Sequence, residues 1–139
     1  MKRFLFLMLM SLPICGFAHD LSGDLGESAS ATDYMMIYCS ADGSITADKL
    51  YFQLSNDSLS PAPLVSAQIA KNNFATNVTD LINGDANSSR VAEVAGGEGA
   101  YRVTINKNGV GKASYSFVYH CESNEGEHAE TTDSTLQNN

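Results

Sequence analysis

The segment AYRVTINKNGVGKASYSFVYHC, residues 100–121, decides the fold of this chain. In its first half, apolar Tyr101, Val103 and Ile105 alternate with polar side chains, and the second half repeats this alternation. A period of two residues is typical of strands that bury one face. Residues 108–111 (NGVG) lie between the two halves and have the composition of a tight turn. We therefore expect two antiparallel strands joined as a β-hairpin.

The same alternation occurs in five shorter segments upstream. They cover residues 33–39, 49–55, 64–71, 73–79 and 90–94. Seven short strands at a spacing of roughly 10–15 residues, with no convincing amphipathic helix, favour an all-β fold. We predict a small antiparallel β-sandwich, of the jelly-roll or immunoglobulin-like kind, over residues 33–121.

The chain has three cysteines, and their positions predict one disulfide. Cys39 and Cys121 each end an alternating segment on its core-facing side, whereas Cys15 lies in an apolar N-terminal stretch. A lone pair of cysteines in an exported domain is expected to be oxidised. The bond would cross the interior or join adjacent inner strands. Closing a loop of about 80 residues stabilises a fold by roughly 4–5 kcal/mol on a chain-entropy basis.

The N-terminus has the pattern of a secretory signal peptide. Two basic residues precede the apolar run FLFLMLMSL, and small residues occupy the positions that signal cleavage requires. We expect a signal peptide of residues 1–18, cleaved after Ala18, and a periplasmic or extracellular mature protein. A lipoprotein acylated at Cys15 is the alternative, although Ile14 stands where lipoprotein signals carry a small residue. No later stretch is long and apolar enough to be expected to cross a membrane.

The segments on either side of the predicted domain are polar. Residues 19–32 (HDLSGDLGESASAT) are rich in glycine and serine, and we expect a flexible lead-in. Residues 122–139 carry five acidic side chains and no basic one, and we expect an acidic disordered tail. The net charge of the chain is −8, and loss of the two basic residues of the signal peptide makes it −10. Such acidity disfavours nucleic acid as a partner.

The glycine-rich stretch before the closing strands carries a resemblance to a known family. GGEGAYRVTI, residues 96–105, is followed by a turn and then by ASYSFV, residues 113–118. This order is similar to the closing strands of bacterial pre-peptidase C-terminal domains, in which a Gly-x-Tyr-x-Val-x-Val strand precedes a Tyr-x-Leu strand. The resemblance implies an exported and usually non-catalytic β-sandwich, of the kind that is appended to secreted hydrolases. The chain departs from that family in its cysteine pair and in standing without an enzyme.

Three histidines are candidates for a metal site. Cleavage after Ala18 would make His19 the N-terminal residue, which offers an α-amine and an imidazole to one ion. His120 and His128 could add imidazoles, and nitrogen donors suit Cu²⁺ or Zn²⁺. Because no His-x-His or Cys-x-x-Cys spacing occurs, we expect three unrelated surface histidines and no cofactor, with a copper or zinc site as the alternative.

Oxygen-rich turns are a weaker case for calcium, and the sequence offers little for catalysis. Residues 42–44 (DGS) and 80–87 (DLINGDAN) gather oxygen ligands, but neither has the twelve-residue calcium-loop pattern. The chain contains no Gly-x-Ser-x-Gly elbow and no phosphate-binding loop that opens a helix. We therefore expect no catalytic residues and no enzymatic activity.

Large side chains on the outward side of the predicted strands offer a binding surface. They are Tyr34, Met36, Tyr38 and Tyr51. Because the outer faces of a sandwich are wet, such a patch indicates a contact surface. The leading hypothesis is a secreted or periplasmic, non-catalytic protein that binds a protein or glycan through this patch or through the rims. The alternatives are a periplasmic copper or zinc binder that uses His19, and a small inhibitor or immunity-type protein of a cell-envelope enzyme.

Overall fold

The computed structural model describes residues 18–139, which form nine β-strands and no helix. The strands are β1 (His19–Leu25), β2 (Thr32–Ser40), β3 (Lys49–Asn56), β4 (Val65–Lys71), β5 (Phe74–Thr79), β6 (Ala92–Val94), β7 (Gly99–Lys107), β8 (Ala113–Glu122) and β9 (Glu130–Gln137). This part of the chain therefore holds no helix that could span a membrane. The predicted signal peptide, with Cys15, falls almost wholly outside the described residues.

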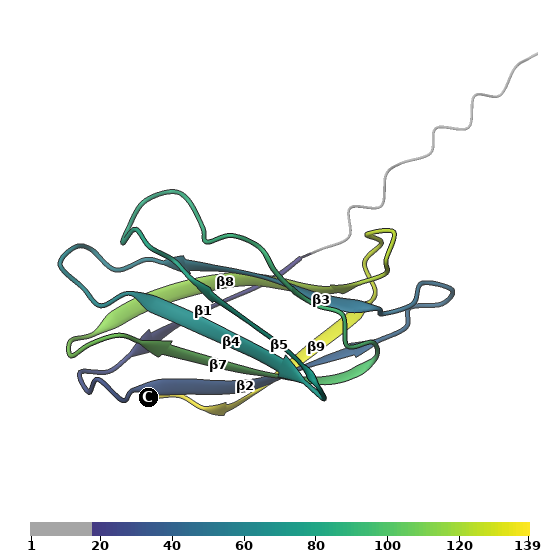
Figure 1. Ribbon diagram of the computed structural model, residues 1–139, viewed down its shortest axis with the longest axis horizontal. Helices are drawn as coiled ribbons and strands as arrows, with labels where there is room; N and C mark the ends of the chain where they lie inside the picture. The colour runs from purple at the N-terminus through teal and green to yellow at the C-terminus, as the bar shows by residue number, and fades with distance from the viewer. Residues whose placement is uncertain (1–17) are drawn as a thin grey trace, which may run out of the picture.

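The nine strands are arranged in two antiparallel sheets that pack face to face (Figure 1). One sheet has four strands in the order β1-β8-β3-β6, and the other has five in the order β5-β4-β7-β2-β9. The predicted all-β sandwich is confirmed. Two sheets stacked in this way bury the inner faces of their central strands, which is why the sequence of those strands alternates with a period of two.

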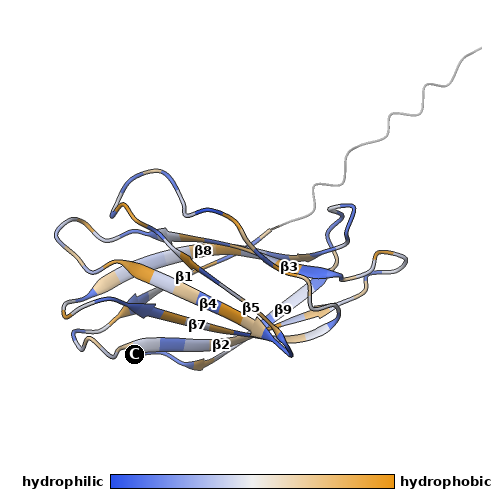
Figure 2. Cartoon of the chain, in the orientation of Figure 1, coloured by the Kyte–Doolittle hydropathy of each residue, from blue (hydrophilic) through white to orange (hydrophobic). Residues whose placement is uncertain are grey.

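The core lies between the sheets and is made of the apolar positions that alternate along the strands. Figure 2 shows this alternation as changes of colour along the ribbons. The largest fully buried side chains are Tyr101, Tyr119, Phe52, Phe117, Leu25, Ile37, Leu50, Leu54, Ile69 and Ile105. The rings of Phe52 and Phe117 stack with their centroids 4.9 Å apart, which joins β3 to β8 on the inner face. The sandwich therefore has one continuous hydrophobic core.

The predicted disulfide is present and joins the two sheets. Cys39 at the end of β2 is bonded to Cys121 near the end of β8, with 5.5 Å between the Cα atoms. Of the two arrangements left open by the sequence, the structure has the bond across the interior. Such bonds persist in oxidising compartments, which is consistent with a periplasmic or extracellular location.

The predicted hairpin over residues 100–121 is wrong, although both of its strands exist. β7 lies between β4 and β2, whereas β8 lies between β1 and β3 in the other sheet. The connection at 108–112 crosses from one sheet to the other, and the ammonium group of Lys107 donates hydrogen bonds to the carbonyl oxygens of Gly26 and Gly111 there. The physical reason is that the apolar faces of the two strands meet across the core, whereas in a hairpin they would lie on one sheet face.

The predictions of a flexible lead-in and of a disordered tail are also wrong for most of the residues they cover. His19–Leu25 pairs with β8 over seven residues as β1, and Glu130–Gln137 pairs with β2 as β9. Both are edge strands, with a neighbour on one side only. Their pairing depends on backbone hydrogen bonds, which polar Ser, Thr and Asp residues form as well as apolar ones do. The sandwich therefore extends from residue 19 to 137 rather than from 33 to 121.

Candidate functional site

Outward-facing residues near the end of β8 form a cluster with their neighbours on β3 and on the β8–β9 connection. Tyr51 lies opposite His120 in the β3–β8 register and opposite Glu93 in the β3–β6 register. Lys49 lies opposite Glu122, and an isolated bridge places His128 opposite Glu122 on its other side. Paired residues of an antiparallel ladder present their side chains on the same face. We call Lys49, Tyr51, His120, Glu122 and His128 the histidine cluster.

His120 lies between two parallel rings. The Tyr51 ring stacks on it at a centroid distance of 4.4 Å, and the His128 ring stacks on it at 4.1 Å. Two rings so close to one imidazole would overlap if they shared a face, so they cover its opposite faces. His120 is therefore only 8% exposed, although its position on the strand predicts an outward side chain. The reason is that the segment 123–129 folds back over the end of β8.

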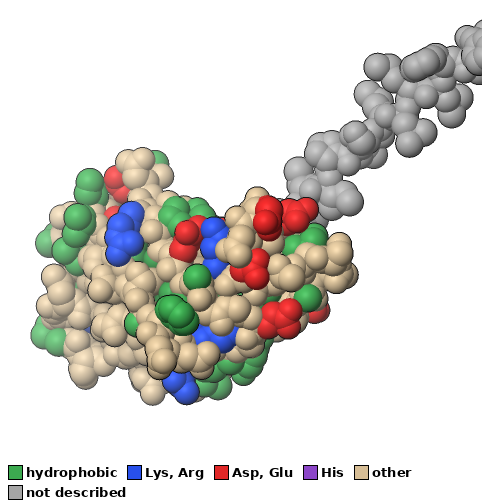
Figure 3. All heavy atoms as spheres, turned by 45° about the vertical axis from the view of Figure 1, so that its right-hand side comes forward, with side chains coloured by type: hydrophobic (Ala, Val, Ile, Leu, Met, Phe, Trp, Pro, Cys, Tyr) green, Lys and Arg blue, Asp and Glu red, His purple; other side chains and the backbone are tan. Residues whose placement is uncertain are grey.

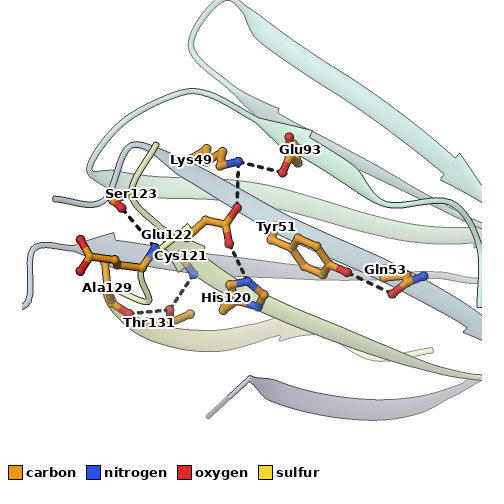
Figure 4. A network of polar contacts seen from close by, with 11 residues as sticks. Lys49, Tyr51, Gln53, Glu93, His120, Cys121, Glu122, Ser123, Ala129 and Thr131 are labelled. Atoms are coloured by element: carbon orange, nitrogen blue, oxygen red, sulfur yellow. Dashed lines mark hydrogen bonds and ion pairs between the residues drawn. The ribbon is translucent and has the colours of Figure 1, made fainter. Parts of the chain in front are cut away.

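A chain of ion pairs holds the Nε2 edge of the His120 ring in place (Figure 4). Nε2 of His120 lies 2.9 Å from one Glu122 carboxylate oxygen, and the ammonium group of Lys49 lies 2.9 Å from the other. Lys49 also pairs with Glu93 at 2.9 Å. Because an ionised carboxylate only accepts hydrogen bonds, Nε2 of His120 carries the proton. Its Nδ1 then has a free lone pair.

The pKa values of the cluster follow from these contacts. The hydrogen bonds that the Lys49 ammonium group donates to Glu122 and Glu93 raise the pKa of Lys49. Desolvation would raise the pKa of Glu122, but hydrogen bonds from Lys49 and His120 outweigh it, and the pKa is lowered. Burial lowers the pKa of His120 against the opposing effect of Glu122, and the charges of His128 and His19 lower it further. Near neutral pH the cluster therefore combines a lysine cation, a glutamate anion and a neutral imidazole.

Two polar atoms of the cluster have no partner. Within residues 18–139, the buried side-chain nitrogen and oxygen atoms without a hydrogen bond are Nδ1 of His120 and Nδ1 of His128. An unpaired buried polar group costs about 1–3 kcal/mol, so it calls for a physical explanation. In the same residues, no three His, Cys, Asp or Glu side chains are arranged to hold a metal ion.

The third histidine lies at the same end of the sandwich. His19 begins β1 opposite Tyr119, and the two rings are 5.5 Å apart. Tyr119 is the neighbour of His120, and the charge of His19 reaches His120 and lowers its pKa. His19 is exposed, unlike His120. Because His19 pairs with core-facing Tyr119, it lies on the opposite face of this sheet from His120. The structure therefore brings His120 and His128 into contact and leaves His19 at the same end of the sandwich, on the other face.

The predicted tyrosine and methionine surface is not brought together. Tyr34, Met36 and Tyr38 lie on the outer face of β2, in the five-stranded sheet, whereas Tyr51 lies on β3 in the other sheet. The hydroxyl group of Tyr34 contacts Sδ of Met36 at 3.5 Å, and both side chains are half-buried. Tyr51 belongs to the histidine cluster, so these four residues do not share one face.

A different surface, not predicted from the sequence, lies at the opposite end of the sandwich. The four most exposed large hydrophobic side chains of residues 18–139 are Leu59 (83%), Val110 (77%), Leu81 (74%) and Ile82 (60%). They lie on the β3–β4, β5–β6 and β7–β8 connections. We call these four residues the loop-end surface. The sequence signal was present, because each is an aliphatic residue within a run of turn-forming residues.

The three connections leave the sandwich side by side. In the ladders, Val65 at the start of β4 pairs with Lys107 at the end of β7, and Ser66 pairs with Thr79 at the end of β5. Pro61, Pro63 and Val110 line an open hollow of about 390 Å³ between two of the connections. Figure 3 shows hydrophobic side chains at the left-hand end of the molecule and acidic ones gathered at the right-hand end.

A network of buried polar groups holds these loops in place. The carboxylate of Asp80 accepts hydrogen bonds from the backbone N–H groups of Asn56 at 2.7 Å and Ile82 at 3.2 Å. The Asn56 amide donates to Asn83 at 2.9 Å and to the Pro63 carbonyl at 3.1 Å. The loops therefore present their aliphatic side chains from a fixed backbone.

The same network uses the oxygen atoms that were considered for calcium. Both carboxylate oxygens of Asp80 and the side-chain oxygen of Asn83 accept hydrogen bonds within the loops. Asp85 accepts hydrogen bonds from the backbone and side chain of Asn87. In the other segment, Asp42 forms a backbone bridge with Ile45. These residues serve as turn-forming groups in the structure.

No protein-family model, curated protein or solved structure matches the chain. The two ends of the sandwich differ in their exposed groups. One end presents aliphatic side chains on fixed loops, and the other holds the three histidines, with the rings of His120 and His128 in contact.

Proposed function

We propose that this protein is an exported, non-catalytic binding protein that engages a protein partner through the loop-end surface. The observation that supports this proposal is that the four most exposed large hydrophobic side chains of residues 18–139 lie on three adjacent loops. Exposed aliphatic residues that gather in one place are typical of interaction sites, whereas scattered ones are ordinary surface.

The ordered backbone of these loops supports a binding role for the loop-end surface. Buried Asn56 and Asp80 order the backbone of the β3–β4 and β5–β6 connections. A surface that is already ordered loses less conformational entropy on association. Burying one leucine or valine side chain against a partner contributes about 1.5–3 kcal/mol before the costs of association. An ordered set of four such residues is a suitable centre for an interface.

The chemistry of the surface favours a protein over a glycan. Aliphatic side chains gain most from contact with other apolar side chains, and a glycan presents mainly hydroxyl groups. The resemblance to pre-peptidase C-terminal domains leads to the same expectation of a non-catalytic role. The signal-peptide pattern and the disulfide support a partner in the periplasm or outside the cell.

Site-specific photo-crosslinking in the source cells tests the proposal. A benzoylphenylalanine residue placed at Leu59 or at Val110 should crosslink to one protein that can be identified by mass spectrometry. The same residue placed at Leu136, which is 56% exposed on β9, is the matched control and should not crosslink to that protein. Equal crosslinking at Leu136 would contradict the proposal.

Binding to the purified partner gives the second half of the test. The paired substitutions Leu59→Asp and Ile82→Asp should weaken the affinity, measured by calorimetry, at least tenfold. Leu136→Asp should leave the affinity unchanged. If the partner is a cell-envelope enzyme and its activity falls on binding, the chain is an inhibitor or immunity-type protein. An unchanged affinity in the paired variant would rule out the loop-end surface as the interface.

A further inference from the structure

We propose that the histidine cluster is an acid-sensitive latch: protonation of His120 releases residues 123–129, which we call the strap, from the outer face of β8 while the sandwich stays folded. An imidazole is the side chain whose charge ordinarily changes between pH 5 and 8, so a buried one can respond to mild acid. The latch is at the opposite end of the sandwich from the loop-end surface, so it is independent of the proposed interface.

The strap lies over His120 and is held there partly by a contact between rings. The ring of His128 stacks on the ring of His120, with 4.1 Å between the centroids and 17° between the ring planes. One residue further along, the backbone N–H group of Ala129 donates a hydrogen bond of 2.9 Å to the carbonyl oxygen of Cys121. The closed position of the strap therefore depends on a ring that can become charged.

The closed cluster suits a neutral His120 and not a protonated one. Nε2 of the neutral ring already donates to Glu122 at 2.9 Å, so an added proton must go to Nδ1. Within residues 18–139, this atom is buried without a hydrogen-bond partner, as is Nδ1 of His128. Because the two rings are nearly parallel, their lone pairs lie alongside each other, and His128 does not accept the new proton. A protonated His120 is therefore a buried charged donor without an acceptor until the strap lifts and admits water.

The charged and titratable groups around His120 come from four strands and the strap. They are Lys49 and Tyr51 on β3, Glu93 on β6, Glu122 on β8, Asp20 on the outer face of β1, and His128 on the strap. Burial is the largest effect, and it lowers the pKa of His120 from its ordinary value of 6.5. Glu122 opposes this change, whereas the charges of His128 and His19 add to it. Lys49 forms ion pairs with both Glu122 and Glu93, which offsets the charge of these carboxylates.

The direction of the response follows from this balance. Below pH 6.5, the open strap allows His120 to take up a proton that the closed strap disfavours, so each further fall in pH shifts the equilibrium towards the open form. Carboxylates ordinarily take up protons near pH 4. A change that occurs between pH 7 and pH 5 therefore reports on imidazoles rather than on the acidic side chains of the strap.

Opening can be confined to the strap because both of its ends are anchored. Cys121, just before the strap, is bonded to Cys39 in the other sheet. Thr131, just after it, pairs with Cys39 in the β2–β9 ladder, and its hydroxyl oxygen accepts a hydrogen bond of 2.8 Å from the backbone of Cys121. The strap can thus lift as a closed loop without separating β8 or β9 from its sheet. Lifting it uncovers the rings of Tyr51 and His120, which are stacked at 4.4 Å.

Amide hydrogen exchange followed by nuclear magnetic resonance tests the latch. The protection factor of the Ala129 amide, which is corrected for the intrinsic effect of pH on exchange, should fall roughly tenfold or more between pH 7.5 and pH 5. The amide of Ile69 in the core strand β4 should stay better protected than that of Ala129 at pH 5. An unchanged protection factor at Ala129, or equal protection of the two amides at pH 5, would overturn the proposal.

Two histidine variants assign the response to His120. His120→Phe keeps a flat ring between Tyr51 and His128 but cannot take up a proton, so its Ala129 protection factor should no longer fall in acid. His19→Gln is the matched control, because it removes a histidine at the same end of the sandwich from the other face of the sheet. This control should respond to acid as the native protein does. A full acid response in His120→Phe, or its loss in His19→Gln, would overturn the role of His120.

The native protein gives a readout that does not depend on the folding of a variant. The Cε1 proton resonance of His120 follows the protonation of its ring, and its midpoint should lie below pH 6.5. The protection of the Ala129 amide should be lost with the same midpoint, because protonation and opening are one event in the latch. Protonation of His120 while Ala129 stays protected would overturn the proposal.

Discussion

The hydroxyl group of Tyr115 donates a 2.5 Å hydrogen bond to the carboxylate of Asp33, inside the sandwich. Tyr115 belongs to β8 and Asp33 to β2, so the bond joins the two sheets as the disulfide does at the other end of the same strands. Asp33 is 2% exposed, and its second oxygen accepts a hydrogen bond of 2.7 Å from the backbone of Asn139. A buried carboxylate is therefore kept in the core by two donors.

Tyr115→Phe should destabilise the protein by about 1–3 kcal/mol, because it leaves the buried carboxylate of Asp33 with one donor fewer. The free energy of unfolding in urea measures this change. Tyr34→Phe is the control, since its hydroxyl group contacts only a methionine sulfur atom at 3.5 Å on the outer face. The control should change stability by less than about 0.5 kcal/mol. Equal losses in the two variants would contradict this account of Asp33.

Stability should fall at alkaline pH because three core tyrosines resist ionisation. Burial raises the pKa of Tyr115, and its bond to Asp33 raises it further. Burial and the bond to Asp133 raise the pKa of Tyr119 in the same way, and burial raises the pKa of Tyr101. A raised pKa means that the folded state holds the proton where the unfolded state loses it. The stabilisation is present below pH 10, the unfolded value, and is lost as the pH rises above it.

Urea unfolding at a series of pH values above 10 measures this loss. The expected slope is about 1.4 kcal/mol per pH unit for each such tyrosine. Tyr115→Phe removes one of the three groups, so its slope should be shallower by about 1.4 kcal/mol per pH unit. The same slope in the native protein and the variant would show that other groups control alkaline unfolding.

Gly23→Ala should destabilise the fold by about 1–3 kcal/mol through overpacking. Gly23 on β1 lies opposite Tyr115, and a Cβ atom there would be 2.4 Å from the tyrosine hydroxyl oxygen. That ring cannot move away without breaking its bond to Asp33. Gly109→Ala is the control, because a Cβ atom at Gly109 would contact nothing within 4 Å. Thermal melting should separate the two variants, and equal melting temperatures would contradict the prediction.

The double substitution Cys39→Ala and Cys121→Ala should cost roughly 4–5 kcal/mol, the chain-entropy value for a closed loop of this length. The two residues are separated by 82 positions and lie in different sheets. Denaturant unfolding of the oxidised protein and of the double variant gives the comparison. Free-thiol labelling of the native protein should find no reactive group at either position. A fully labelled native pair would refute the disulfide.

Truncation after Ala129 should destabilise the protein by roughly 3 kcal/mol or more, because it removes β9 and its backbone hydrogen bonds to β2. The truncation also removes Asp133, the partner of the Tyr119 hydroxyl group at 2.5 Å. Glu125→Gln is the control for loss of acidic charge from the C-terminal region. Unfolding in urea measures both. An unchanged stability of the truncated chain would mean that residues 130–139 do not belong to the folded unit.

Part of the candidate sites could be recognised from the sequence. His19, His120 and His128 were identified by residue type, and the structure brings His120 and His128 into contact, with His19 at the same end of the sandwich on the other face of the sheet. Their relation to Glu122 and Lys49 was not predictable, because it depends on the register of β8 against β3. The burial of His120 was also not predictable, because it depends on the fold-back of residues 123–129. A strand pattern gives the face of a residue but not what covers that face.

The sequence by itself determined the local character of the chain: short strands with one apolar face, and two cysteines on the core side. These follow from alternation, because burial of one face acts on every second side chain. Only the tertiary structure decided which sheet each strand joins, that β1 and β9 are strands, and which loops lie together. Strand pairing is made by backbone N–H and C=O groups that all residues share, so composition does not select the partner. The histidine cluster and the loop-end surface both depend on that pairing.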